Sequence, residues 1–222
     1  MDVPILYLDK ELIVCVKPAG LLSEEGGLPE LLRGQCGGEV YCVHRLDKAV
    51  GGVMVYTRTA PAAAALGEAI SSRRAEKRYL AVVPGEAEAE AELRDLLYHD
   101  AAKNKSYVVR RPRRGVREAV LCYERVATAE SEGERFSLLR IRLMTGRTHQ
   151  IRVQFASRGL PLIGDARYGS RYRGHALGLW SEELRFAHPS GGEPLVFSCP
   201  PPAIWPWTLF DAPPNGETCT DT

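Results

Sequence analysis

Several features that commonly identify an enzyme class are absent from this chain of 222 residues. It has no glycine-rich fingerprint for a dinucleotide and no phosphate-binding loop for a nucleoside triphosphate. It also has no His-x-x-x-His or Cys-x-x-Cys pair, one of which usually contributes to a zinc site, so we expect no bound metal. No hydrophobic run is long enough to cross a membrane, and the sequence therefore predicts no membrane segment.

Cysteine is sparse and shows no paired spacing. The six cysteines, at positions 15, 36, 42, 122, 199 and 219, are typical of reduced thiols, and we expect no structural disulfide. Residues 1–16 carry acidic side chains and only a five-residue apolar run, so they do not resemble a signal peptide. We therefore expect a cytoplasmic protein with one domain over residues 1–210 and a polar, disordered tail over residues 211–222.

Acidic residues are missing from two long segments, although the net charge of the whole chain is only +1. Residues 103–117 hold seven basic residues, and residues 135–164 hold six arginines. The compensating acid lies in residues 86–92 and after residue 211. Segregated charge of this kind can line a groove for a polyanion, while either segment alone is also compatible with a solvated basic surface.

Short apolar runs predict a β-rich first half. Residues 5–16, interrupted by a turn at 9–11, indicate two strands, and residues 28–33 indicate a short helix that Gly34 ends. Residues 53–56 predict a buried strand. Thr59 is a suitable N-cap for an alanine-rich helix with Pro61 in its first turn.

The second half continues this pattern. Residues 77–83 predict a strand, residues 86–92 a short acidic segment, and residues 100–114 an exposed basic loop with one extended piece at 106–109. Residues 119–126 and 136–143 predict paired strands. Thr148 is the expected N-cap of a helix that continues through Ser157, and residues 184–207 predict two further short strands.

One loop holds an aspartate between basic residues. Asp47 follows His44 and Arg45 and comes before Gly51-Gly52 and the strand that begins at Val53. Loops carried by a rigid sheet are common places for reacting groups, so Asp47 is a candidate catalytic carboxylate, although a loop aspartate can also simply cap its own turn. A protein kinase is excluded, because Leu46 interrupts the His-Arg-Asp triplet and no Asp-Phe-Gly follows.

Several segments carry a resemblance to a known family. The matching segments, in order, are Lys17-Pro18-Ala19-Gly20, His44-Arg45-Leu46-Asp47 with Gly52, Lys77-Arg78-Tyr79, Gly146-Arg147-Thr148-His149-Gln150-Ile151-Arg152, Gly164-Asp165 with Tyr168-Gly169, and His188-Pro189 before Leu195. Together they cover residues 3–207, and the chain resembles the RluA-type RNA pseudouridine synthases.

The resemblance implies a fold and a set of site residues. The fold is α+β, with a large, mainly antiparallel sheet, flanking helices and a central cleft. Asp47 matches the catalytic aspartate, Tyr79 the tyrosine that packs on the target uracil and takes part in proton transfer, and Arg152 the arginine that pairs with the aspartate. Arg45 matches a residue that fills the space left by the flipped base. RNA binding or support of the site is implied for three further residues: Arg147, His149 and Gln150.

The chain departs from the family in two places. Many members carry Thr-Ser before the first glycine of the aspartate loop, whereas this chain has Val50-Gly51, so two hydroxyls that could hold the loop are missing. The small N-terminal RNA-binding domain of many relatives is not seen before Ile5. We therefore expect the catalytic domain to select the RNA.

The implied reaction converts uridine to pseudouridine in ribosomal RNA or tRNA, with large-subunit ribosomal RNA ranked slightly ahead. Because substrate and product contain the same atoms, no cofactor or metal is expected. Two alternatives stay open: a catalytically idle RNA-binding relative, and a hydrolase in which Asp165 serves as a second acid near Asp47. We expect a monomer whose partner is RNA, and the sequence does not choose between a covalent and a glycal route.

Overall fold

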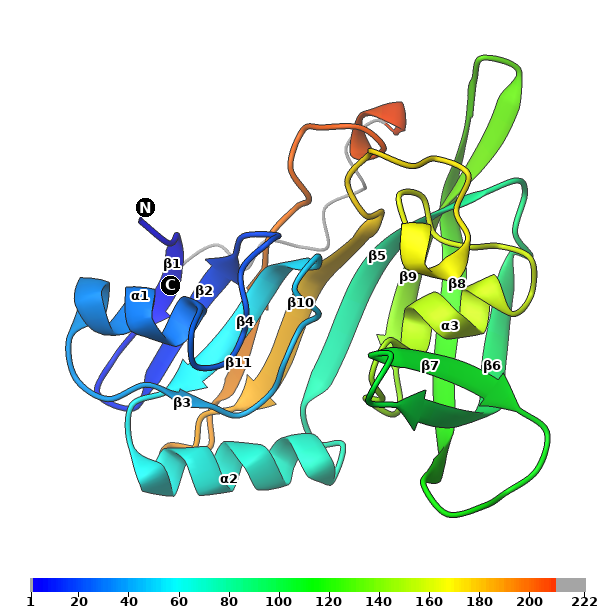
Figure 1. The fold of residues 1–222 in the computed structure, drawn as a ribbon. Helices are drawn as coiled ribbons and strands as arrows, with labels where there is room; N and C mark the ends of the chain where they lie inside the picture. Colours follow the sequence, from blue (N-terminus) through cyan, green and yellow to red (C-terminus); the bar gives the residue numbers. More distant parts are fainter. Residues whose placement is uncertain (1, 211–222) are drawn as a thin grey trace.

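One large sheet organises the molecule, which the computed structural model describes for residues 2–210 (Figure 1). Its strands are, in chain order, β1 (Ile5–Leu8), β2 (Leu12–Lys17), β3 (Tyr41–Cys42), β4 (Gly51–Thr57), β5 (Glu76–Pro84), β6 (Glu90–Asp100), β7 (Lys105–Val109), β8 (Val116–Ser131), β9 (Glu134–Leu143), β10 (Leu179–Ala187) and β11 (Pro194–Ser198). The main path runs β1-β2-β4-β10-β5-β9-β8-β6-β7, with β11 paired to β10 and β3 to β4. Within the described residues, only β4 and β10 pair in parallel. The mainly antiparallel α+β fold is therefore confirmed.

The sheet consists of two parts that meet between β10 and β5. The N-terminal half-sheet, formed by β1 to β4 with β10 and β11, carries helices α1 (Leu28–Cys36) and α2 (Ala60–Ser71). The C-terminal half-sheet, formed by β5 to β9, carries α3 (Gln150–Ala156), which contacts β6 and β7. Two short 3-10 helices complete the elements: η1 (Ala166–Tyr168) and η2 (Trp207–Leu209).

A continuous apolar core joins the two half-sheets. It includes Met54 of β4, Leu139 and Ile141 of β9, and Phe155 of α3, all of which are almost completely buried. Burial of this apolar surface is the main force that holds the halves in a fixed relation. The residues that project from both halves toward their junction are therefore held on rigid supports.

Several local predictions are confirmed. The turn at residues 9–11 separates β1 from β2, and the amide of Ala62 donates to the Thr59 hydroxyl at 3.3 Å, as expected of an N-cap. Strands β8 and β9 pair along ten residue positions and extend beyond the predicted segments. No helix among residues 2–210 is long and apolar enough to cross a membrane.

Other local predictions are wrong. Helix α1 continues past Gly34 and ends before Gly37, whose φ of 68° is the left-handed conformation that glycine adopts readily. The N-cap of α3 is His149 and not Thr148. Strand β6 was not predicted, because Asp95 lies between the buried Leu93 and Leu97 on the same face of the strand and interrupts the apolar alternation.

The cysteines within residues 2–210 are free thiols: Cys15, Cys36, Cys42, Cys122 and Cys199. The predicted polar tail at 211–222, which includes the sixth cysteine, lies outside the described residues.

Candidate active site

The loop that carries Asp47 lies between β3 and β4 and is held from the N-terminal side. The hydroxyl of Ser23 donates to the carbonyl of Leu46 at 2.9 Å and accepts from its amide at 3.1 Å. The amide of Gly20 donates to the carbonyl of Lys48 at 2.7 Å. These bonds fix the backbone on both sides of Asp47, so its carboxylate is presented from an ordered loop.

Lys17 fixes the far end of the same loop. Its side chain is fully buried, and its ammonium donates to the carbonyls of Pro18 at 3.1 Å, Lys48 at 3.2 Å and Val50 at 2.7 Å. Burial lowers the pKa of Lys17 to about 8, and the charge of Asp47 works in the opposite direction. A buried cation that is satisfied by three carbonyls explains why a lysine stands at the end of β2.

The Val50-Gly51 departure has a packing reason in this chain. A Cβ at residue 51 would lie 2.4 Å from the Trp180 ring, and a Cβ at Gly52, where φ is 121°, would lie 2.2 Å from the carbonyl oxygen of Ser181. Both glycines therefore permit the close parallel contact of β4 with β10. Lys17 and the glycines hold the loop without the two missing hydroxyls.

Arg152 reaches Asp47 from the opposite half-sheet. It lies on α3, is 7% exposed, and donates through Nη1 to Oδ2 of Asp47 at 2.9 Å. Its Nε and Nη2 donate to the two carboxylate oxygens of Asp165 at 2.7 and 2.8 Å. Arg152, and not an acid, contacts Asp47, and Asp165 is buried with both of its oxygens bonded to Arg152. This arrangement removes the hydrolase alternative, in which Asp165 serves as a second acid.

The formal charges of Asp47, Arg152 and Asp165 do not cancel. Asp47 and Asp165 share the single guanidinium of Arg152, so the group keeps one net negative charge, and Asp47 is the member that is partly exposed. Burial lowers the pKa of Arg152, but the hydrogen bonds and negative charges of Asp165 and Asp47 raise it by more. The net effect is a raised pKa for Arg152. Arg152 therefore stays charged and aims Asp47 without fully neutralising it.

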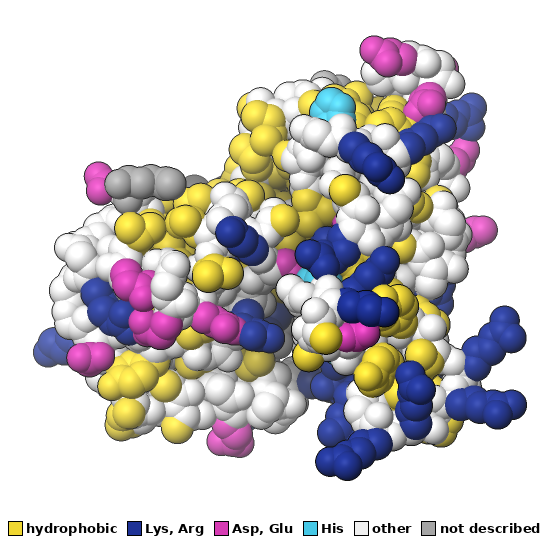
Figure 2. Space-filling model, viewed as in Figure 1, with side chains coloured by type: hydrophobic (Ala, Val, Ile, Leu, Met, Phe, Trp, Pro, Cys, Tyr) yellow, Lys and Arg dark blue, Asp and Glu magenta, His cyan; other side chains and the backbone are white. Residues whose placement is uncertain are grey.

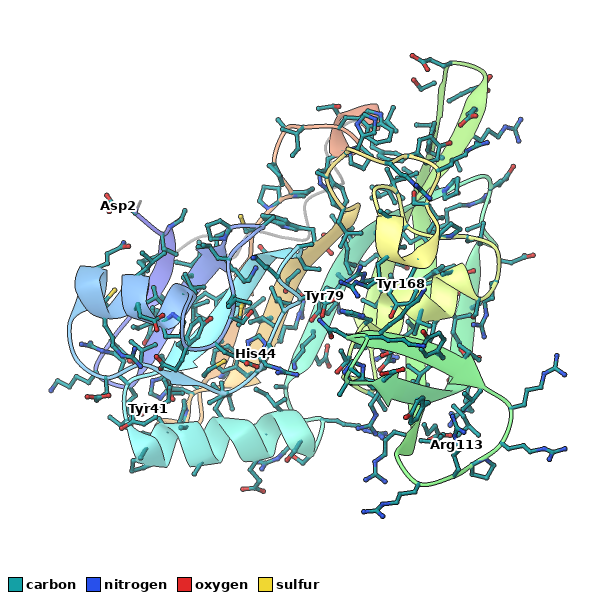
Figure 3. All side chains as sticks on the ribbon, in the orientation of Figure 1. Asp2, Tyr41, His44, Tyr79, Arg113 and Tyr168 are labelled. Atoms are coloured by element: carbon teal, nitrogen blue, oxygen red, sulfur yellow. The ribbon has the colours of Figure 1, made fainter. Side chains whose placement is uncertain are left out.

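Tyr79 lies on β5 at the junction of the two half-sheets, and Figure 3 shows it beside the cleft that also holds Tyr168. Its side chain is only 6% exposed. Burial, followed by the negative charge of Asp47, raises the pKa of Tyr79 above its ordinary value. The phenol is therefore protonated at neutral pH and can donate a proton near the carboxylate.

The other predicted residues lie around this centre in different ways. Nε2 of His149 lies 3.7 Å from Oδ2 of Asp47. Arg147 is exposed and donates to the carbonyl of Glu118 at 3.0 Å. Arg45 is exposed on the N-terminal side and forms an ion pair with Glu24.

Gln150 is buried and its amide is used within the protein. Its carbonyl oxygen accepts from the Thr145 hydroxyl at 2.8 Å and from the amide of Arg147 at 3.0 Å, and its nitrogen donates to the carbonyl of Val120 at 3.1 Å. These bonds hold the loop before α3, which is a supporting role within the protein.

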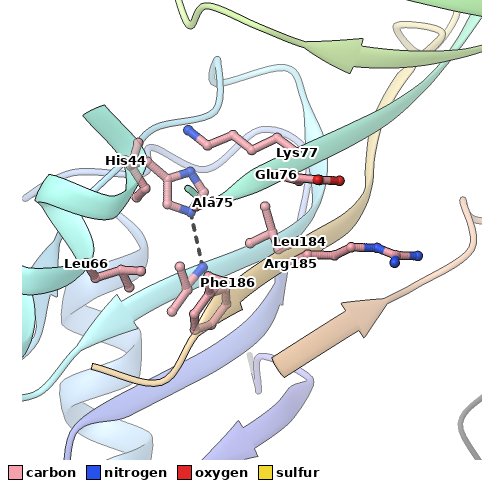
Figure 4. A pocket seen from close by; sticks show the side chains of 10 residues that line it. His44, Leu66, Ala75, Glu76, Lys77, Leu184, Arg185 and Phe186 are labelled. Carbon is pink, nitrogen blue, oxygen red and sulfur yellow. Dashed lines mark hydrogen bonds between the residues drawn. The ribbon is translucent and has the colours of Figure 1, made fainter. Parts of the chain in front are cut away.

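His44 opens the aspartate motif, yet its ring faces the interior. Its Nε2 accepts from the amide of Val55 at 3.3 Å, and it lines a small cavity with Lys77, Leu66 and Phe186 (Figure 4). Burial, followed by the charge of Lys77, lowers the pKa of His44 far below its ordinary value. His44 therefore joins the aspartate loop to β4 as a neutral side chain.

A furrow runs between the halves, with Lys and Arg side chains gathered in it and over the lower part of the C-terminal half (Figure 2). The loop between β7 and β8, residues 110–115, is called the basic loop below. It exposes Arg110, Arg111, Arg113 and Arg114. Within residues 2–210, no three His, Cys, Asp or Glu side chains are grouped to hold a metal ion.

The sequence did not predict the contacts of two residues that support the Asp47 site. Lys17 and Asp165 both lie in segments that carried the family resemblance, but their spacing along the chain does not show which groups they contact. Asp165 is 13 residues from Arg152, and Lys17 is 33 residues from Val50. Their burial and their bonds appear only in the folded chain.

The fold is that of RNA pseudouridylate synthase domains. The structure of human RNA pseudouridylate synthase domain containing 1 superposes with a TM-score of 0.78 at 22% sequence identity, covering 91% of this chain and 85% of that one. Human RNA pseudouridylate synthase domain containing 4 gives a TM-score of 0.76 at 24% identity, covering 93% and 91%.

The sequence comparisons assign the family. Residues 11–157 match the RNA pseudouridylate synthase family. The chain is 36% identical over 233 residues to ribosomal large subunit pseudouridine synthase D of Xanthomonas campestris pv. campestris, covering 90% of this chain and 67% of that protein. It is 33% identical over 211 residues to dual-specificity RNA pseudouridine synthase RluA of Yersinia pestis (88% and 97% covered), and 29% identical over 229 residues to tRNA pseudouridine synthase C of Vibrio parahaemolyticus (92% and 93% covered). The chain belongs to the RNA pseudouridylate synthase family, in its RluA-type branch, and is an isomerase.

Proposed function

We propose that this isomerase converts uridine to pseudouridine in a structured RNA, with Asp47 as the catalytic carboxylate. The observation that carries the proposal is the arrangement around Asp47. One oxygen is held by a buried arginine, the loop is fixed on both sides, and a buried tyrosine lies nearby. Perturbed, partly buried titratable groups at a cleft are typical of a reacting centre.

The reaction breaks the bond from the ribose to nitrogen 1 of uracil, rotates the base, and joins the ribose to carbon 5. Asp47 either attacks the ribose or removes a ribose proton on the glycal route, and either step needs an ionised oxygen that faces the sugar. The positive charge of Arg152 lies against Asp47 and aims the carboxylate. Because Asp165 binds the same guanidinium, that charge is shared between two carboxylates.

The isomerisation is complete when carbon 5 of the uracil loses its proton and nitrogen 1, freed from the ribose, gains one, so the atoms balance. Tyr79 supplies a ring face on which the uracil can pack, and a hydroxyl that can donate one proton while accepting another in this exchange. In this role the burial of Tyr79 excludes water from the rotating base. Tyr79 and Asp47 therefore have separate roles, at the base and at the sugar.

The uridine must leave its stack to reach Asp47, at a cost of roughly a few kcal/mol. Arg45, which is exposed beside the loop, occupies the space left by the base after exchanging Glu24 for RNA. Arg147 and the basic loop supply positive charge along the furrow, where phosphate contacts offset the cost of flipping. Gln150 acts behind them as a support.

For the RNA, large-subunit ribosomal RNA ranks slightly ahead of tRNA. The relatives are named as a ribosomal large subunit synthase, a tRNA synthase and a dual-specificity enzyme, so both RNAs fit the family. A uridine in a stem-loop suits a cleft of this kind, because its base unstacks at low cost. The enzyme acts in the cytoplasm as a monomer.

Mapping pseudouridines by carbodiimide-dependent primer extension, in cells with and without the gene, tests both parts of the proposal. We expect one or a few sites to disappear with the gene and to return with the wild-type protein but not with Asp47→Asn. Unchanged maps, together with RNA binding by the pure protein, would instead indicate an idle RNA-binding relative. Purified protein should then modify an isolated stem-loop that carries the mapped uridine nearly as fast as the full RNA.

A further inference from the structure

The two oxygens of Asp47 have different surroundings. Oδ2 accepts from Nη1 of Arg152 at 2.9 Å and lies 3.7 Å from Nε2 of His149. No side chain or backbone group among residues 2–210 donates a hydrogen bond to Oδ1. The carboxylate is therefore held by one oxygen, and the other is available to the substrate.

The orientation of the His149 ring is controlled from its far side. Its Nδ1 lies 2.9 Å from the hydroxyl oxygen of Tyr168, which also accepts from the backbone amide of Ser106 at 2.9 Å. Tyr168 belongs to η1, three residues after Asp165, and its ring lies under the guanidinium of Arg152 with 5.2 Å between them. Figure 3 labels Tyr168 and Tyr79 near the junction of the two half-sheets. One short turn therefore contacts both groups that face Oδ2 of Asp47.

The contacts of Tyr168 and Asp47 together favour one tautomer of His149. The Tyr168 oxygen already accepts from the Ser106 amide, and when its hydroxyl donates to Nδ1 of His149, the imidazole proton lies on Nε2, the atom that faces Asp47. The alternative tautomer would direct the Nε2 lone pair at a carboxylate oxygen, which is unfavourable.

Protonation of both side chains agrees with this assignment. Burial lowers the pKa of His149, with the charge of Asp47 acting against it, so the ring is neutral at neutral pH. Burial likewise raises the pKa of Tyr168, which keeps its hydroxyl proton available. At 3.7 Å the contact with Asp47 is longer than a hydrogen bond, and catalytic contacts of this kind commonly tighten when substrate binds.

We propose that Tyr168 and His149 are positioning residues that, with Arg152, hold Oδ2 of Asp47 and leave Oδ1 as the oxygen that reacts with the ribose. The proposal rests on the proposed role of Asp47. His149 then acts through the carboxylate, in contrast to the RNA contact expected from the sequence. In the free protein Arg152 is hydrogen-bonded to Oδ2, and His149 adds a second donor when its 3.7 Å contact shortens on substrate binding, so rotation of the carboxylate is then restricted further.

The tautomer can be measured without substrate. In protein with 15N-labelled histidine, long-range 1H–15N spectra distinguish a ring protonated at Nε2 from one protonated at Nδ1, and the His149→Asn variant identifies the signals of residue 149. We expect His149 to be protonated at Nε2 in the wild-type protein and to populate both tautomers in Tyr168→Phe. A ring protonated at Nδ1 in the wild-type protein would overturn the proposal.

Activity then tests the consequence. Tyr168→Phe keeps the ring against Arg152 and removes only the hydroxyl, so we expect kcat to fall about 10- to 100-fold with KM for RNA nearly unchanged. A wild-type kcat in this variant would contradict the positioning role. A matched fall in thermal stability would suggest damage to the fold, so the unfolding temperature is measured in parallel and is expected to shift little.

A pair of substitutions at residue 149 provides a sharper comparison. His149 has φ of 55°, a conformation that asparagine adopts more readily than glutamine. The amide nitrogen of glutamine can reach the position of Nε2, whereas asparagine ends near Nδ1. We expect His149→Gln to retain more kcat than His149→Asn although its backbone fit is worse, and the reverse order would reject a donor at Nε2.

Failure of this proposal can be told apart from failure of the proposed function. If the wild-type protein isomerises no RNA, the function is wrong, and the tautomer still decides the geometry. If the wild-type protein is active but His149 is protonated at Nδ1, only the positioning proposal is wrong.

Discussion

The cleft and the basic loop use arginine in opposite ways. Arg152 is buried, makes three hydrogen bonds to two carboxylates, and has a single possible geometry. The arginines of the basic loop are exposed, and none of the four forms an ion pair within residues 2–210. Arg113 only lies over the Tyr98 ring, with 4.6 Å between guanidinium and ring centre. A buried arginine such as Arg152 therefore holds its carboxylate partners in position, whereas the exposed arginines of the basic loop can bind a polyanion.

The largest expected difference in the free energy of unfolding comes from replacing one arginine by methionine in the cleft and one in the basic loop. Arg152→Met leaves Asp165 as a buried charge without its cation, so we expect about 3–5 kcal/mol less stability and loss of detectable isomerisation. Arg114→Met should change the free energy of unfolding by less than about 0.5 kcal/mol. Urea unfolding of both variants, with turnover assays beside it, checks the pair. Equal effects on unfolding would mean that the two regions do not differ as described.

Tyr79→Phe tests the chemistry of the cleft without removing a charge. We expect kcat to fall about 100-fold, since the proton-transfer hydroxyl is lost, while the ring still packs on the base and the affinity for RNA is kept. Single-turnover kinetics with a stem-loop RNA separates the chemical step from binding. Normal turnover would leave Tyr79 with a packing role only.

Removing the four arginines of the basic loop should affect binding and spare chemistry. With Arg110, Arg111, Arg113 and Arg114 changed to alanine, we expect the slope of log Kd against log salt to fall by up to about 3, since single-stranded contacts contribute about 0.7 each. The control changes four arginines that already pair with a glutamate. Arg33 is half-buried, and the other three are exposed: Arg74, Arg94 and Arg135. An equal change of slope in both variants would mean that the basic loop has no special contact with RNA.

The smallest expected effect concerns Gly51. Gly51→Ser places a Cβ against the Trp180 ring, so we expect a loss of about 1–3 kcal/mol in the free energy of unfolding. Gly67→Ser on α2, where a Cβ meets open space, is the control and should not destabilise the protein. Equal stability of the two variants would show that contact with Trp180 does not account for the glycine.

The sequence predicted the parts of the fold whose pattern is local. Apolar alternation located β9, and Thr59 with Pro61 located the start of α2. Strand β6 was not predicted because Asp95 interrupts the apolar alternation between its buried leucines. The local pattern also predicted that α1 ends at Gly34, whereas the helix tolerates this exposed glycine and continues to Cys36.

The candidate site shows the same division. Motif matching indicated Asp47, Tyr79 and Arg152, and the structure brings Asp47 and Arg152 into contact across 105 residues of chain. It could not indicate that Asp165 takes the other side of Arg152, or that Lys17 holds the aspartate loop. Those contacts depend on how the chain folds in three dimensions, and the periodicity of the sequence carries no information about that arrangement.

The central claim is that Asp47 performs the chemistry, and one substitution tests it most directly. Asp47→Asn keeps the size of the side chain and one acceptor oxygen for Arg152, and removes the charge. With RNA tritiated at uracil carbon 5, we expect wild-type protein and the control Asp100→Asn, whose side chain is as exposed as that of Asp47, to release tritium. Asp47→Asn should release none above background while binding RNA within about twofold of wild type. Tritium release by Asp47→Asn at the wild-type rate would contradict the account.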